Sequence, residues 1–125
     1  MANPNIVNVT TILGVTTYLT PANTTANTLL SNAASSGLVY KINQIVCANV
    51  NGASAVNATV AINNAAAGAG TNFPVISTIS VPASASVIAV DKTTAIYLME
   101  NSSIVVTSGT SSGITYTLSY ESIAA

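Results

Sequence analysis

The sequence predicts an all-β fold in which a single domain forms a β-sandwich. The first observation is strict alternation of apolar and polar residues over 55–63 (AVNATVAIN) and 114–120 (ITYTLSY), the period of a half-buried strand. The second is that Gly, Pro and Asn turn signals recur about every ten residues. A chain of 125 residues has the size of one domain with one core. We therefore expect one domain over 1–125, of jelly-roll or immunoglobulin-like type, with seven to ten short antiparallel strands.

The expected strands are rich in β-branched residues. In chain order they cover residues 5–13, 15–20, 26–31, 38–50, 55–63, 75–81, 86–90, 95–99, 103–107 and 114–120. No segment of useful length shows a helical period, so essentially no α-helix is expected.

Alternation also predicts which side chains face the core. The long segment 38–50 is expected to lie centrally, with its inner side formed by Tyr40, Ile42, Val46 and Ala48. The inner residues expected in 55–63 are Val56, Ala58, Val60 and Ile62, with Asn57, Thr59 and Asn63 on the other face. In 114–120 the expected inner residues are Ile114, Tyr116, Leu118 and Tyr120.

One low-complexity segment interrupts this pattern, at residues 63–74 (NNAAAGAGTNFP). Small uncharged residues suit a flexible or closely packed loop, and we expect it on the surface. Phe73 is the only phenylalanine of the chain and lies at its end. Because exposed aromatic side chains often anchor protein contacts, Phe73, Tyr18 and Tyr97 are candidate contact residues.

Charge is the most unusual feature of the composition. Two lysines and three acidic residues make up 4% of the chain, with no histidine and no tryptophan, whereas about a quarter of an ordinary domain is charged. General acid and base catalysis, metal binding and phosphate binding all draw on such groups. We therefore expect no enzymatic activity and no cofactor. A net charge of −1 also argues against nucleic acid as a partner.

The remaining sequence features are those of a non-membrane protein without disulfides. No apolar stretch approaches the roughly 18 residues of a membrane-spanning helix, so we expect no membrane partner, and the first residues do not resemble a secretory leader. The one cysteine, Cys47, lies in the apolar run 45–48 and is expected to be a buried, unreactive thiol. Few charges favour association over a freely diffusing monomer.

An enzyme remains the less favoured alternative. It would be a small hydrolase in which Glu100, Glu121 or Lys41 converge in a pocket. Asp91 and Lys92 are adjacent in the sequence, and we interpret them as a solvated turn. No Gly-x-Ser-x-Gly motif accompanies Lys41.

Several segments resemble a family of small virion proteins of tailed bacteriophages, notably those of marine cyanobacteria. The resemblance begins at 3–9 (NPNIVNV) and continues through 31–37 (SNAASSG), 39–43 (VYKIN), 77–83 (STISVPA), 91–92 (DK), 96–98 (IYL) and 119–123 (SYESI). These are strand and turn sequences without catalytic content, and they extend over nearly the whole chain.

The resemblance implies a β-sandwich that serves as a decoration or cement protein on the capsid exterior. Its implied partners are the major capsid protein and further copies of itself, for which we expect a homotrimer, assembled after synthesis in the cytoplasm of the host bacterium. The alternative is a tail, neck or fibre-associated β-module that contacts the host surface.

Overall fold

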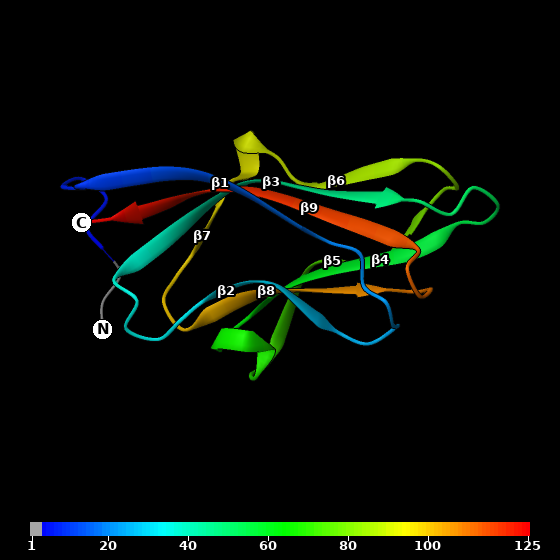
Figure 1. The fold of residues 1–125 in the computed structure, drawn as a ribbon, viewed down its shortest axis with the longest axis horizontal. Coiled ribbons are helices and arrows are strands. Elements are labelled where there is room, and N and C mark those ends of the chain that lie inside the picture. The colour runs from blue at the N-terminus through cyan, green and yellow to red at the C-terminus, as the bar shows by residue number, and fades with distance from the viewer. Residues whose placement is uncertain (1–3) are drawn as a thin grey trace.

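The computed structural model describes residues 4–125 as two antiparallel sheets packed face to face (Figure 1). The strands are β1 (Thr11–Leu19), β2 (Asn27–Asn32), β3 (Leu38–Asn49), β4 (Val56–Asn63), β5 (Asn72–Val81), β6 (Ser86–Val90), β7 (Ile96–Leu98), β8 (Ser102–Ser108) and β9 (Ile114–Ala124). Two short 3₁₀ turns, η1 (Ala66–Gly68) and η2 (Lys92–Thr94), are the only helical elements in the described residues. The predicted single-domain sandwich is confirmed, and its nine strands fall within the predicted number.

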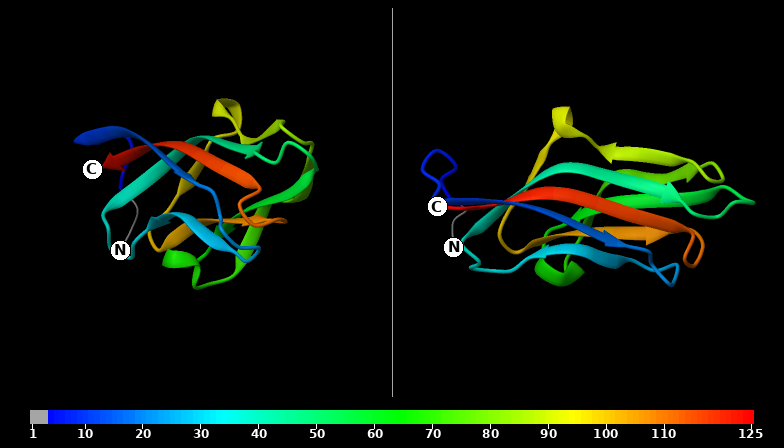
Figure 2. Two further views of the ribbon diagram at one scale, coloured as in Figure 1. Left: turned by 45° about the vertical axis from the view of Figure 1, so that its right-hand side comes forward. Right: turned by 45° about the horizontal axis from the view of Figure 1, so that its top comes forward.

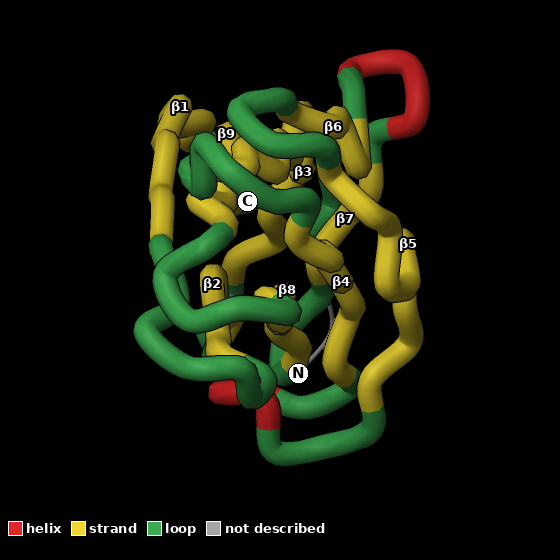
Figure 3. The backbone as a smooth tube through the Cα atoms, turned by 90° about the vertical axis from the view of Figure 1, so that its right-hand side faces the viewer, coloured by secondary structure: helices red, strands yellow, loops and turns green. Residues whose placement is uncertain are grey.

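Each sheet mixes strands that are distant in the sequence. The five-stranded sheet has the order β1-β9-β3-β6, with β7 also paired to β3, and the four-stranded sheet has the order β2-β8-β4-β5. Consequently β1 lies at an edge beside the last strand of the chain, above β2 in the other layer (Figures 2 and 3). The first described residues and the C-terminal end of β9 lie at the same end of the sandwich (Figure 1), where the Thr10 amide donates a hydrogen bond to the Ala124 carbonyl at 2.8 Å.

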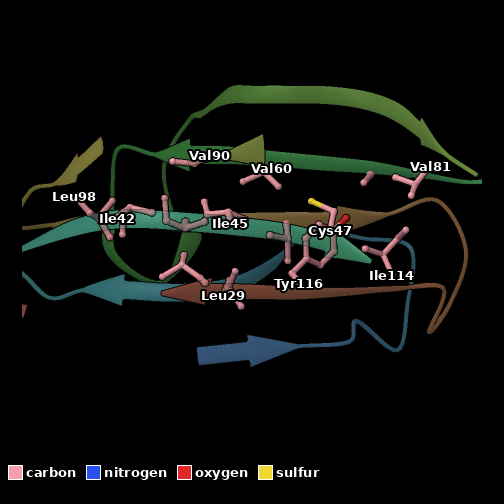
Figure 4. Close-up of a cluster of buried hydrophobic side chains, with 14 of the residues drawn as sticks. Leu29, Ile42, Ile45, Cys47, Val60, Val81, Val90, Leu98, Ile114 and Tyr116 are labelled. Carbon is pink, nitrogen blue, oxygen red and sulfur yellow. The ribbon is translucent and has the colours of Figure 1, made fainter. Parts of the chain in front are cut away.

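The core between the sheets is aliphatic, as the composition suggests (Figure 4). Its fully buried centre includes Ile42, Ile45, Val60, Ile104, Tyr116 and Leu118. Tyr116 is the largest of these side chains, and its hydroxyl donates a hydrogen bond to the carbonyl oxygen of Thr107. The predicted inner faces of 55–63 and 114–120 are confirmed by the burial of Val56, Ala58 and Val60 and of Ile114, Tyr116 and Leu118.

The inner face predicted for 38–50 is only half correct. Ile42 is buried, but Val46 and Ala48 are partly exposed on the outer side, and Ile45 and Cys47 are fully buried instead. The cause is a bulge, because the pairing of β3 with β9 shifts between Ile42 and Gln44. One extra residue reverses the side-chain direction for the rest of the strand.

The N-terminal strands also differ from the prediction. A single strand, β1, replaces the two strands expected at 5–13 and 15–20, because it continues through Gly14. Residues 5–10 lie outside any strand. There the side chain of Asn5 accepts a hydrogen bond from the Val7 amide at 2.9 Å, and such Asn turns compete with strand pairing.

The alanine and glycine segment is a surface loop, but it is closely packed. Its 3₁₀ turn η1 lies against the outer side of the four-stranded sheet, where the Gly68 amide donates to the Ser103 hydroxyl at 3.0 Å. Gly68 has φ +71°, and a Cβ there would lie 3.0 Å from the Thr28 hydroxyl. Ala61, Asn63 and Val105 are buried on this face of the sheet, which alternation alone assigns to solvent. Small residues are required because the backbone itself lies on the sheet.

Candidate interaction surface

The outer face of the five-stranded sheet carries two of the three candidate contact residues. Tyr18 lies in a row across the strands, opposite Thr117 on β9, which in turn lies opposite Val46 and then Ile88. Tyr18 is 74% exposed and Ile88 is 57% exposed. This row is apolar or neutral from one edge of the sheet to the other. We call it the Tyr18 row.

The second row on this face contains Tyr97 and two charged side chains. Tyr97 lies opposite Lys41, which lies opposite Glu121, which lies opposite Gly14. The Glu121 carboxylate accepts a hydrogen bond from the Asn43 amide at 3.2 Å. Opposite charges directly across a strand pair stabilise a sheet modestly. This arrangement indicates a structural role for the pair.

Phe73 lies apart from the two tyrosines. It belongs to β5, at the edge of the four-stranded sheet, opposite Ile62, and it is 56% exposed. All three candidate side chains are exposed. Only Tyr18 and Tyr97 share a surface, because only β1 and β7 belong to the same sheet.

The predicted turn at Asp91 and Lys92 is confirmed as an exposed capping turn. The Asp91 carboxylate accepts hydrogen bonds from the amide and the hydroxyl of Thr93, at 2.9 and 2.6 Å. The hydrogen bond from the Thr93 hydroxyl is the main cause that lowers the pKa of Asp91. This cap accounts for the acidic residue without a catalytic role.

A shallow depression of about 310 Å³ lies beside this turn. Its lining residues are Asn43, Gln44, Asp91, Lys92 and Ser119. None of the residues required by the hydrolase alternative lines this depression. Lys41 and Glu121 lie in the second row, beside Tyr97, and Glu100 lies in the turn between β7 and β8. Among residues 4–125, no three His, Cys, Asp or Glu side chains lie close enough together to hold a metal ion.

Cys47 is fully buried in the core, on the inner side of β3. Burial raises the pKa of its thiol to about 12, because a thiolate would lose its hydration. The thiol is therefore protonated, and poorly nucleophilic, at neutral pH. This agrees with the interpretation of Cys47 as a packing residue.

This burial predicts an alkaline limit to stability. A group whose pKa is raised on folding favours the folded state below its unfolded pKa, and this contribution is lost as pH rises toward the folded value. Stability should be nearly flat from about pH 5 to 8, since no histidine is present, and should fall between about pH 8.5 and 12. Burial also raises the pKa of Tyr116, which acts in the same direction.

Urea unfolding of wild type and of Cys47→Ala at pH 7 and pH 10.5 measures the effect. At pH 7 the free energy of unfolding of the variant should be about 1–2 kcal/mol lower than that of wild type, because packing is reduced. When the pH is raised from 7 to 10.5, the free energy of unfolding of the variant should fall by about 1–3 kcal/mol less than that of wild type. The reason is that the variant lacks the buried thiol that titrates in this range. Equal alkaline losses in the two proteins would contradict the assignment to Cys47.

Exposed apolar side chains on β1 were not identified from the sequence. Ile12, Leu13 and Val15 are 52%, 57% and 37% exposed. Edge position causes this exposure, and edge position depends on pairing with β9, 100 residues away in the sequence. No local pattern could have revealed it.

Within the described residues, no helix is long and apolar enough to cross a membrane. No protein-family model matches the sequence, and no curated protein matches it either.

Proposed function

We propose that this protein is a structural component of a bacteriophage virion, a decoration protein that binds the major capsid protein on the capsid exterior and is made in the host cytoplasm. The observation that carries the proposal is the outer face of the five-stranded sheet. The Tyr18 row of this face is uncharged, and Tyr97 is exposed on the same face, in the second row beside Lys41. An uncharged row of side chains on a face with exposed aromatic residues suits binding to a repeated protein surface.

The chemistry of the chain supports a passive role. Lys41 and Glu121 lie opposite each other on β3 and β9, and Asp91 and Lys92 lie in a capping turn, where structural explanations are sufficient. Rows of Thr, Ser and apolar side chains supply hydrogen bonds and contact area without charge. The rigid sandwich holds these side chains in place, which lowers the entropy lost on binding.

Binding to capsids that lack this protein tests the proposal. Ile88→Lys, in the Tyr18 row, should weaken capsid binding at least about tenfold, since it brings an unpaired charge into an apolar contact. The matched control is Phe73→Lys, the same change at a side chain of similar exposure on the other sheet. The control should bind like wild type.

Salt should have little effect on wild-type binding. We expect the dissociation constant to change by less than about threefold between 0.05 and 0.5 M NaCl, because the Tyr18 row carries no charge that salt could screen. Failure to bind such capsids under any of these conditions would exclude the decoration role. Binding to host cells instead would favour the fibre-associated alternative, in which the depression lined by Asn43 and Gln44 would be the contact site.

A further inference from the structure

The free edge of β1 is an unprotected strand edge. β1 is nine residues long, pairs with β9 without a register shift, and contains neither proline nor a charged side chain. Proteins normally protect such an edge because its unpaired amides and carbonyls can pair with another strand. Leu13 and Val15 point to the core side of the sheet, opposite Ser122 and Tyr120, yet remain exposed.

Every other edge among the described strands carries a protecting feature. β5 contains Pro74 and two register shifts in its pairing with β4. β2 has a register shift between Thr28 and Leu30, and its Ser31 hydroxyl accepts a hydrogen bond from the η1 amide of Ala67 at 3.1 Å. β6 and β7 are only five and three residues long. Protection is absent at β1 alone, which indicates that β1 is covered in the working protein.

We propose that the β1 edge binds a second copy of this chain, through antiparallel pairing of β1 with β1 across a twofold axis. The pairing is self-complementary, because both strands are the same length and carry no charges that would repel one another. It merges the two five-stranded sheets and satisfies the free backbone groups of both edges. A ring through unlike edges would require one of the protected edges.

The centre of the strand defines the expected register. With Val15 opposite Val15 of the second copy, Leu13 lies opposite Thr17 and Ile12 lies opposite Tyr18. Leu13 and Val15 of both copies then form one apolar strip on the core side of the joined sheet. Twofold pairing gives two copies, whereas the sequence analysis expects a homotrimer. The measured number of copies therefore distinguishes the two predictions.

Charge exchange at Val15 tests the pairing without any capsid. Sedimentation equilibrium of the purified full chain should show a dimer. Val15→Lys and Val15→Glu, each alone, should weaken dimerisation at least about tenfold, because like charges meet at the axis. An equimolar mixture of the two variants should restore the dimer, because opposite charges then meet.

Ile88→Lys is the matched control, because it adds the same charge on the same sheet at the far edge. It should dimerise like wild type, with thermal unfolding showing that all variants fold. A monomeric wild type at about 0.5 mM, a trimer, or loss of the dimer in Ile88→Lys would each overturn the proposal. Since Ile88→Lys reports on capsid binding and Val15→Lys on self-pairing, failure of one proposal is distinguishable from failure of the other.

Discussion

Replacing Tyr116 with alanine is expected to lower the free energy of unfolding by about 3–5 kcal/mol. Tyr116 is the largest fully buried side chain and lies on β9, between β1 and β3. Its removal leaves a cavity between two sheets whose strands are fixed by backbone pairing within each sheet, so the core collapses only partly to fill it. In a domain of this size the melting temperature should fall by roughly 10–20 °C.

Tyr116→Phe separates packing from hydrogen bonding. It keeps the ring and removes only the hydroxyl that donates to the Thr107 carbonyl, so the loss should be about 1–2 kcal/mol. Chemical denaturation of both variants gives the two values. If Tyr116→Ala were no less stable than Tyr116→Phe, the ring would not be the main packing element at the centre of the core.

Replacing Asn63 with alanine is expected to cost about 2–4 kcal/mol and to release the loop at 64–71. The Asn63 side chain is buried and donates to the Gly70 carbonyl at 3.1 Å and to the Asn72 side chain at 2.7 Å. Its oxygen accepts from the amides of Ala65 and Gly70, at 3.0 and 2.8 Å. Alanine would leave these backbone groups without partners on a sheet face that also buries Val105.

Asn57→Ala is the control, since Asn57 is an exposed asparagine on the same strand. Its stability should change by less than about 0.5 kcal/mol. Hydrogen exchange of the amides of Gly68 and Gly70 measures loop release directly. Fast exchange at these amides in Asn63→Ala, with protection unchanged in the centre of β4, is the expected result; full protection of both would show that the loop is held by other contacts.

The buried asparagines show a limit of prediction from the sequence. Three asparagines, Asn32, Asn49 and Asn63, are buried, and each donates a hydrogen bond to a backbone carbonyl outside its own strand. Asn49, for example, donates to the Val81 carbonyl at 2.9 Å. In the sequence they resemble the many exposed asparagines of the chain. Their partners lie up to 66 residues away, so local context carries no signal for their role.

Alternation within strands predicted some inner faces correctly and others wrongly. Alternation in 114–120 predicted the inner face of β9 correctly because that strand has no bulge on its own side of the pairing. The same reasoning misassigned Val46 and Ala48, because an extra residue at Asn43 reverses the direction of the side chains after it. A bulge is visible only in the pairing of two strands, and alternation describes one strand at a time.

By itself, the sequence determined the all-β class, the single domain and the scarcity of groups that could perform catalysis. Those properties follow from chain length, from composition and from a two-residue period. None of these depends on how distant segments of the chain pair. The tertiary structure alone decided that Tyr18 and Tyr97 share a face without Phe73, and that β1 has a free edge. The physical reason is that the order of strands in a sheet is set by contacts between distant segments, and residues that alternate correctly can still lie at a centre or at an edge.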